Sequence, residues 1–376
     1  MTSPPVEPAA DLSSAELARY ARQIVIPGVG VDAQRRLKAA RVLVLGAGGL
    51  GSPVLLYLAA AGVGTLGIVD DDVIEASNLH RQVIHGTPNL GAAKTASAAA
   101  RVRELNPHVI VQEHHERLTS ANALDLFRRY DLVVDGSDNF ATRYLAADAA
   151  ELTDRPVVWG SILRFEGQIS VFWASRGPSY RDLFPDPPEG PDAISCEQAG
   201  VFGVLPGQVG TAMATEAIKL ITGLGETLLG RLAVLDALAG RWREYRLERD
   251  PERAPITALG APAADDGAPA DADGLSPAGL DALLAARARG KADFDLIDVR
   301  EEEEFALGRI SGARLVPLSR IRRGDAEIPH DRRVVLVCQG GVRSASLLAS
   351  LQQNGHPRVR HLAGGMDAWR RAHTDR

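Results

Sequence analysis

Cys338 and the residues that follow it form the part of the chain with the clearest chemical potential. Residues 335–346 read VLVCQGGVRSAS, so an aliphatic run precedes the cysteine, and two glycines and Arg343 follow it. A glycine-rich loop between a strand and a helix turns several backbone N–H groups toward one point at the positive pole of the helix, which favours a bound anion. Arg343 adds a fixed positive charge at the rim. These features favour a reactive thiolate over the alternative that Cys338 is a small buried hydrophobe.

A nucleophilic thiol in such a loop is typical of two enzyme classes, phosphatases and sulfurtransferases, because both need a cysteine cradled by amides. The chain holds one other cysteine, Cys196, in the segment DAISCEQAGVFG. The polar neighbours of Cys196 predict a mobile surface loop. No arginine or glycine nest adjoins it, so both a covalent role and a bystander role stay open at this point.

A second candidate site begins at a glycine-rich turn in the first half of the chain. Gly46, Gly48 and Gly51 form the pattern G-x-G-x-x-G after the strand predicted at 41–45 and before a predicted helix, whose N-terminal amides can receive phosphate. Asp70 ends the next predicted strand, where a dinucleotide fold places its ribose-binding acid. An oxidoreductase that uses NAD is therefore one hypothesis.

The segment after Asp70 favours a triphosphate over a redox dinucleotide. Asn78, Arg81 and Lys94 follow in order, and cationic side chains hold β- and γ-phosphates and offset the charge on a leaving pyrophosphate. Asp138 and Asn139 follow a later strand and offer hard oxygen donors to a phosphate-bound Mg²⁺. Each residue alone would be an ordinary surface or turn residue. Because all of these residues occur together and in this order along the chain, they predict an ATP site.

The elements that position these residues predict two α/β domains. A chain of 376 residues with 45% hydrophobic content exceeds what one core usually serves. Residues 258–275 consist mostly of Ala, Pro, Gly and Asp and lack apolar periodicity, which predicts a flexible linker. Apolar strands alternate with helical stretches before and after it, so we expect α/β domains at 1–257 and 276–376.

Charge and hydropathy exclude several classes. The net charge is −6 and the basic residues are dispersed, which argues against a nucleic-acid partner. The N-terminus lacks the basic start and apolar core of a signal peptide, so we expect a cytoplasmic protein. The uncharged stretch between residues 41 and 70 is interrupted by glycines, which indicates a buried βαβ unit and no membrane span.

The motifs RYARQ, GAGGLGS, SNLHRQ, GAAK, DGSDN and EAIKL together resemble the MoeB/ThiF branch of ubiquitin-activating-type adenylyltransferases, over about residues 15–255. The resemblance implies a Rossmann-like domain that binds ATP, with Asp138 near Mg²⁺. It also implies that Arg22 reaches the phosphates of a neighbouring subunit in a homodimer. The residues that it places around ATP are Gly49, Asp70, Ser77, Asn78, Arg81, Lys94, Asp138 and Asn139.

The family's substrate is the C-terminal Gly-Gly carboxylate of a small ubiquitin-like sulfur carrier protein. The carboxylate attacks the α-phosphate and leaves an acyl-adenylate, which is a far better electrophile. Many relatives also bind a structural zinc through two C-x-x-C pairs. The corresponding segments here, YRDLFP and RLERDPERAPI, contain no cysteine, so we expect no zinc site and loops held by side-chain packing.

The second domain resembles a rhodanese domain over about residues 275–372, through LIDVREEEEFALGRISGARLVPL, CQGGVRS and HLAGGMDAW. The six-residue loop from Cys338 to Arg343 implies a persulfide carrier whose sulfur comes from a cysteine desulfurase or thiosulfate. Arg309 and Ser311 stand where relatives have His and Pro, which affects the expected selectivity. The persulfide would attack the acyl-adenylate, and Cys196 stands where relatives carry a cysteine proposed for thioester or disulfide formation.

Several clients fit this chemistry. The pattern resembles the molybdopterin-linked branch most, so the small subunit of molybdopterin synthase is the first candidate, and thiamine-, cysteine- and tRNA-thiolation carriers are alternatives. A different class of function is a binding protein, in which the rhodanese fold is a docking or sensing module. The NAD-dependent oxidoreductase is the remaining alternative.

Overall fold

The chain forms two compact α/β units. The computed structural model describes residues 4–8, 11–188, 200–260 and 274–373. The first unit comprises Met1–Ala263 and the second Ala264–Arg376. Most of the predicted linker, residues 261–273, lies outside the described residues, as does Cys196. Within the described residues, no helix has both the length and the apolar character needed to cross a bilayer.

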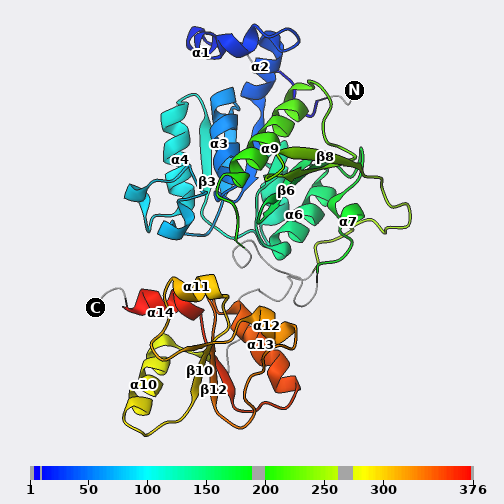
Figure 1. Ribbon diagram of the computed structural model, residues 1–376. Helices are drawn as coiled ribbons and strands as arrows, with labels where there is room; N and C mark the ends of the chain where they lie inside the picture. The colour runs from blue at the N-terminus through cyan, green and yellow to red at the C-terminus, as the bar shows by residue number, and fades with distance from the viewer. Residues whose placement is uncertain (1–3, 9–10, 189–199, 261–273, 374–376) are drawn as a thin grey trace. The chain divides into compact units, whose positions relative to one another are not determined.

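The first unit is built around a single mixed sheet (Figure 1). Its strands are β1 (Arg41–Leu45), β2 (Thr65–Val69), β3 (Ile110–His114), β4 (Leu132–Asp135), β5 (Val157–Leu163), β6 (Glu166–Phe172), β7 (Arg231–Asp236) and β8 (Arg241–Arg246). Its helices are α1 (Ser14–Ile24), α2 (Gly30–Ala39), α3 (Gly51–Ala61), α4 (Lys94–Leu105), α5 (Ala123–Arg128), α6 (Phe140–Thr153), α7 (Tyr180–Leu183) and α9 (Leu205–Thr222), with 3₁₀ turns η1 (Ala76–Asn78) and η2 (Thr87–Asn89).

The strand order is β3-β2-β1-β4-β5-β6-β7-β8. Strands β1 to β5 pair in parallel, whereas β6, β7 and β8 extend the sheet in antiparallel fashion. The chain leaves β1 in one direction to form β2 and β3 and in the other to form β4 and β5. This reversal leaves a crevice at the carboxyl ends of β1 and β4, which is where ligands bind in open α/β sheets.

Alternate residues of β1 and β4 enter separate cores on the two faces of the sheet. Val42 and Val44 pack with α3, α4 and α9, and Leu43 and Leu45 pack with α5 and α6. Strands covered on both faces are continuously apolar, as the sequence RVLVL is. The two helical layers fix the strand ends that form the crevice.

Helices α1 and α2 lie at the opposite edge of the sheet, where the parallel strands begin (Figure 1). Gln34 of α2 is fully buried there and donates from Nε2 to the carbonyl oxygen of Ala61 at 2.9 Å. Its Oε1 accepts a hydrogen bond from Gln23 at 2.8 Å. Both ends of the Gln34 amide are therefore satisfied, and the contact ties α1 and α2 to the end of α3.

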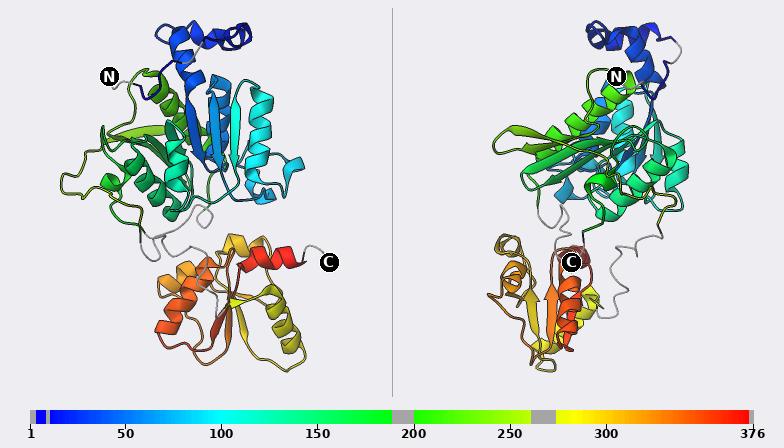
Figure 2. Two further views of the ribbon diagram at one scale, coloured as in Figure 1. Left: turned by 180° about the vertical axis from the view of Figure 1, so that it is seen from behind. Right: turned by 90° about the vertical axis from the view of Figure 1, so that its right-hand side faces the viewer.

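The second unit holds a five-stranded parallel sheet in the order β11-β10-β12-β13-β9 (Figures 1 and 2). Helices α10 and α14 share one core with the sheet, and α12 and α13 share the core on its other face. The elements are β9 (Gly274–Leu275), α10 (Pro277–Ala288), β10 (Asp295–Asp298), α11 (Glu302–Ala306), β11 (Arg314–Leu315), α12 (Leu318–Arg322), β12 (Val334–Val337), α13 (Val342–Gln353), β13 (Val359–Leu362) and α14 (Gly365–His373).

Candidate active sites

A cleft of about 490 Å³ opens at the carboxyl ends of β1, β2 and β4 in the first unit. The sequence predicted a nucleotide site at this edge. Eight of the predicted residues line the cleft, namely Gly46, Gly48, Gly49, Asp70, Arg81, Lys94, Asp138 and Asn139. Parallel strands end at the same edge of a sheet, which brings these residues together although they are far apart in the sequence.

The glycine-rich turn has the backbone geometry that its sequence predicts. Gly46 has a φ of +86°, a left-handed conformation that glycine adopts without strain. A Cβ on Gly51 would lie 1.9 Å from the carbonyl oxygen of Gly46, so Gly51 allows close packing of turn and helix. Gly51 is buried at the start of α3 and is not among the residues that line the cleft.

Asp70, which directly follows β2, holds this glycine-rich turn through hydrogen bonds. Its Oδ2 accepts a hydrogen bond from the backbone N–H of Ala47 at 2.8 Å, and its Oδ1 accepts one from the N–H of Asp72 at 2.9 Å. Burial raises the pKa of Asp70 above its usual value, against the opposing effects of Lys94 and these two amides. Asp70 therefore fixes the glycine turn as well as lining the cleft.

Lys94 provides a charged wall to the cleft. Its Nζ lies 2.7 Å from Oδ2 of Asp72, and its side chain is 8% exposed. Burial alone would lower the pKa of Lys94, but Asp70 and Asp72 raise it above its usual value, so the ammonium stays charged. A buried, permanently charged cation at this position suits a phosphate group.

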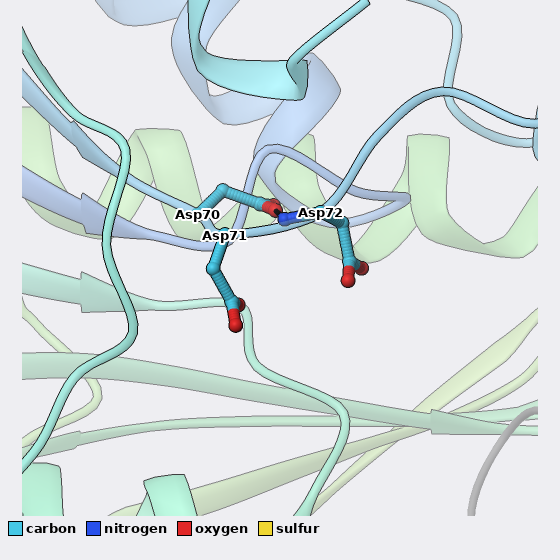
Figure 3. A group of neighbouring side chains, drawn as sticks. All are labelled: Asp70, Asp71 and Asp72. Atoms are coloured by element: carbon cyan, nitrogen blue, oxygen red, sulfur yellow. Dashed lines mark hydrogen bonds between the residues drawn. The ribbon is translucent and has the colours of Figure 1, made fainter. Parts of the chain in front are cut away.

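Three consecutive residues after β2, Asp70, Asp71 and Asp72, each have one carboxylate oxygen within 4.8 Å of the others (Figure 3), and Asp72 is the partner of Lys94. Asp71 and Asp72 also line the cleft but were not among the predicted residues. The signal was present in the run VDDD at the end of β2. Their oxygens are donors of the kind that Mg²⁺ prefers, and Asp138 faces the same cleft.

Asn139 combines a place in the cleft with a structural role. Its Oδ1 accepts a hydrogen bond from the N–H of Thr142 at 2.8 Å and so caps α6. The neighbouring Arg143 is buried and donates to the carbonyl oxygen of Ser137 at 3.0 Å. These contacts fix the loop between β4 and α6, which presents the exposed carboxylate of Asp138.

Besides Gly51, three predicted residues lie away from the lining of the cleft. Ser77 and Asn78 belong to η1, and the Oδ1 of Asn78 accepts from the backbone N–H of Glu75 at 3.2 Å. Local hydrogen bonds of this kind fold the turn around the Asn78 side chain. Arg22 is exposed on α1, at the opposite edge of the sheet. The prediction that Arg22 acts in the cleft of a partner subunit stays a prediction.

Sequence reasoning missed two buried residues of the segment 78–85, both of which adjoin the glycine turn. Gln82 lines the cleft and is 4% exposed. His85 lies 2.9 Å through Nε2 from the carbonyl oxygen of Ala47 and 3.0 Å through Nδ1 from Oγ of Ser97. Because a carbonyl only accepts, Nε2–H donates to Ala47 and Nδ1 accepts from Ser97. His85 thereby fastens the segment to the glycine turn.

The second unit contains the thiol that the sequence singled out. Cys338 follows β12 and is 1% exposed. Its Sγ accepts hydrogen bonds from the backbone N–H of Gly341 at 3.1 Å and that of Ser344 at 3.4 Å. The hydroxyl of Ser344 lies 3.3 Å from the same sulfur. The predicted convergence of loop amides on the sulfur is present.

Arg343 lies at this loop but is paired with Glu304 of α11. The NH1 and NH2 groups donate to the two carboxylate oxygens at 2.8 and 2.6 Å. Burial alone would raise the pKa of Glu304, but the hydrogen bonds from Arg343 and from the backbone N–H of Glu301, together with the charges of Arg343 and Arg300, lower that pKa below its usual value. Burial alone would lower the pKa of Arg343, and Glu304 raises it. The guanidinium is therefore held in one place at the rim of the loop, and the carboxylate of Glu304 balances its positive charge.

The loop that carries Cys338 is also held by the first residues of α14. The backbone N–H of Met366 donates to the carbonyl oxygen of Cys338 at 2.8 Å, and that of Asp367 donates to Gln339 at 3.0 Å. A Cβ on Gly365 would lie 2.4 Å from both carbonyl oxygens, so only glycine allows α14 to approach this closely. Arg300, fully buried, adds a hydrogen bond to Oε1 of Gln339 at 3.0 Å.

The two departures from the rhodanese pattern lie on the loop after α11. Arg309 lies over the ring of Phe305, with 5.0 Å between the guanidinium carbon and the ring centroid. Ser311 is exposed. Arg309 thus covers an aromatic residue of α11, the helix that also carries Glu304. Their predicted effect on selectivity stays a prediction.

The segments that carry zinc ligands in relatives are joined here by ion pairs. Arg253 donates from Nε to Asp182 at 2.9 Å and from NH2 to Glu151 at 3.0 Å. Tyr180 packs against Phe184 and Trp159 in tilted and edge-on arrangements, with ring centroids 5.0 and 5.5 Å apart. These contacts hold the two segments together, and the absence of zinc stays a prediction.

Comparison with known proteins covers both units. The model of the ThiF family matches residues 20–255, and that of the rhodanese-like domain matches residues 280–372. The chain is 50% identical to a Mycobacterium tuberculosis protein named probable adenylyltransferase/sulfurtransferase MoeZ, over 97% of this chain and 96% of that protein. It is 52% identical to the sulfur carrier protein adenylyltransferase of Thermus thermophilus, over 64% of this chain and 90% of that protein.

A solved structure supports the architecture of the first unit. The crystal structure of E. coli MccB with ATP matches with a TM-score of 0.56 and 20% sequence identity, over 63% of this chain and 74% of that one. This likeness concerns the fold alone. The family models and the relatives carry the assignment, and by them the chain belongs to the ThiF family and bears a rhodanese-like domain in its second unit.

Proposed function

We propose that this chain uses ATP to adenylate the C-terminal glycine of a ubiquitin-like sulfur carrier protein and then converts that carboxylate to a thiocarboxylate. The chain is an enzyme of the adenylyltransferase and sulfurtransferase class, as its relatives are. The observation that carries the proposal is that one chain contains both a cation-walled nucleotide cleft and a buried thiol ringed by amides.

In the first step a carboxylate oxygen of the carrier attacks the α-phosphorus of ATP, and pyrophosphate leaves. Lys94 and Arg81 line the cleft and would offset the negative charge that develops on the leaving group. The carboxylates of Asp71, Asp72 and Asp138 would hold Mg²⁺ against the phosphates, because they present hard oxygen donors to the same cleft. Mg²⁺ supplies further neutralisation of phosphate charge when bound.

In the second step a persulfide on Cys338 attacks the acyl-adenylate. The terminal sulfur bonds to the acyl carbon, AMP leaves, and an acyl-disulfide joins the carrier to Cys338. A second thiolate then attacks the Cys338 sulfur, which releases the thiocarboxylate and leaves a disulfide at Cys338. Cys196 is the proposed second thiol, and its position lies outside the described residues. The amides of Gly341 and Ser344 would stabilise the anionic sulfur.

Other parts of the proposal concern partners. The carrier's Gly-Gly tail is the proposed substrate, and a cysteine desulfurase or thiosulfate is the proposed sulfur donor. A homodimer would bring the exposed Arg22 of one subunit to the phosphates of the other. The small subunit of molybdopterin synthase is the proposed client, because the cysteine-free segments and the second, rhodanese-like domain of this chain resemble the molybdopterin-linked branch most.

The test is to mix the purified chain with ATP, Mg²⁺, thiosulfate and each candidate carrier, and to weigh the carriers by mass spectrometry. The client gains one sulfur in place of one oxygen, only when ATP is present. If no diglycine-ended carrier supports ATP–pyrophosphate exchange or gains sulfur, the proposal is wrong.

A further inference from the structure

His361 is a buried histidine on a face of β13 that is otherwise packed in an apolar core. It is 1% exposed, and its strand position pairs with Leu336 of β12. Val359, two positions earlier and so on the same face, packs in one core with Cys338. An apolar residue would suit this position, because a buried polar side chain costs free energy unless it is hydrogen-bonded. The hydrogen-bond partner of His361 therefore indicates its role.

That partner is the hydroxyl of Ser344, which also contacts the thiol. Ser344 is fully buried in the first turn of α13, and its Oγ lies 3.2 Å from Nδ1 of His361. The same Oγ lies 3.3 Å from Sγ of Cys338 and 2.9 Å from the carbonyl oxygen of Gly341. A single hydroxyl thus connects the imidazole to the sulfur, and a helix and a strand hold the two side chains in place.

The Ser344 hydroxyl carries one hydrogen, so it cannot donate to all three neighbours at once. If Nδ1 of His361 carries no proton, it can accept that hydrogen, and Oγ then offers a lone pair that suits a thiol S–H. If Nδ1 carries a proton, it donates to Oγ, and the hydroxyl hydrogen can point to a sulfur anion. The protonation of His361 therefore selects which form of Cys338 the hydroxyl stabilises.

Few other groups can take the proton of Cys338. The sulfur residue is 1% exposed, so bulk water has little access to it. The carboxylates near the loop are bound to other side chains, Asp298 to Arg300, Glu304 to Arg343 and Asp367 to Gln339. His361 is the titratable side chain that a single hydroxyl connects to the sulfur.

We propose that Ser344 and His361 form a relay that takes up the proton of Cys338 and keeps it near the sulfur during sulfur transfer. The S–H bond breaks as Oγ gains that proton, and the original Oγ–H bond breaks as Nδ1 gains a proton. No electrons are exchanged, and the products are a thiolate and a protonated imidazole. The inference rests on the proposed function and deepens it, because it assigns how a buried thiol becomes the nucleophile that attacks the sulfur donor.

The test measures how fast iodoacetamide alkylates Cys338 in the full-length chain from neutral to alkaline pH, by mass spectrometry of the peptide that contains it. His361→Asn keeps a hydrogen-bonding side chain that cannot take up the proton, and Ser344→Ala removes the connection. The matched control is His356→Asn, which replaces another buried histidine of the same unit, one that packs against His330. Thermal melting of every variant separates a folding defect from a change in the relay.

His361→Asn and Ser344→Ala are each expected to lower the alkylation rate near neutral pH by about tenfold, the scale of one lost charge partner. At alkaline pH, where hydroxide removes the proton, both rates should come within about twofold of the wild type. The double variant should lose no more than either single variant, because both substitutions break the same relay. His356→Asn should keep the wild-type profile.

A loss of rate in His361→Asn that is equal at every pH would assign His361 a supporting role only, and an unchanged rate would also overturn the relay. Multiplying effects in the double variant would contradict a shared path. Thiocyanate production from thiosulfate and cyanide is measured in parallel with the wild type. Its absence would refute the proposed sulfur transfer, whereas its presence together with a wild-type alkylation profile in His361→Asn would refute the relay alone.

Discussion

Arg343 donates two hydrogen bonds to the carboxylate of Glu304, 2.8 and 2.6 Å long, at the rim of the loop that carries Cys338. The sequence predicted that this arginine would add a fixed positive charge at the rim of the loop. In the structure the carboxylate balances that charge. The field at Cys338 therefore depends on a residue of α11 that is far from the cysteine in the sequence.

Replacing Glu304 by Gln is expected to make the Cys338 thiolate more reactive, because Arg343 then keeps its charge without a carboxylate beside it. The rate of alkylation by iodoacetamide should rise by roughly three- to tenfold, the scale of the effect of one neighbouring charge. Glu303→Gln on the same helix is the matched control and keeps the wild-type rate. Equal rates in all three proteins would show that the ion pair does not act on the thiol.

Cys338→Ala is expected to abolish cyanide-dependent thiocyanate production from thiosulfate, since the sulfur has no other proposed carrier in this step. ATP–pyrophosphate exchange with the carrier should remain, because the nucleotide cleft lies in the first unit. Cys196→Ala provides the contrast, with thiocyanate production retained and transfer of sulfur to the carrier lost. Full thiocyanate production in Cys338→Ala would refute the persulfide assignment.

Asp138→Asn is expected to raise the Mg²⁺ concentration needed for half-maximal ATP–pyrophosphate exchange, because one anionic oxygen donor is lost from the cleft. A shift on the order of tenfold is expected, comparable to other losses around metal sites. Asp125→Asn, on the exposed side of α5, is the control. A lower rate with an unchanged Mg²⁺ requirement would assign Asp138 a role other than metal binding.

Because His85 is buried, we expect the folding stability of the first unit to fall at acid pH. Burial lowers the pKa of His85, with Lys94 acting in the same direction, against the hydrogen bond to Ala47. The unfolded chain therefore binds a proton near pH 6.5 that the folded chain resists. The stabilisation that comes from keeping His85 neutral is fully present above that pH. As the pH falls toward the lower pKa of the folded state, the free energy of unfolding decreases by at most ~1.4 kcal/mol per pH unit.

His85→Gln keeps a donor for Ala47 but does not titrate, so its stability should fall less between pH 7 and 5 than that of the wild type. Urea midpoints at several pH values give this difference. His108→Gln, at an exposed position, should follow the wild-type curve. Parallel curves for wild type and His85→Gln would show that His85 does not cause the acid sensitivity.

The prediction of family, of α/β fold class and of enzyme class is confirmed by the family models and the relatives. The convergence of Gly46, Asp70 and Lys94 was predictable because parallel strands share one carboxyl edge. The partner of Arg343 was not predictable, since residues 301–304 are four consecutive glutamates and only the tertiary fold selects Glu304. Gln82 was overlooked for a similar reason, because nothing in a one-dimensional pattern shows that its amide oxygen is buried without a partner among the described residues.

The backbone contacts between α14 and the cysteine loop have a consequence for how this family can diversify. Hydrogen bonds from the backbone N–H groups of Met366 and Asp367 hold the loop, and these bonds do not depend on the side chains of the loop. Val342, in the same loop, is 54% exposed. New docking preferences can therefore evolve at position 342 without disturbing the chemistry of the thiol, which makes it a natural place to randomise when retargeting sulfur delivery.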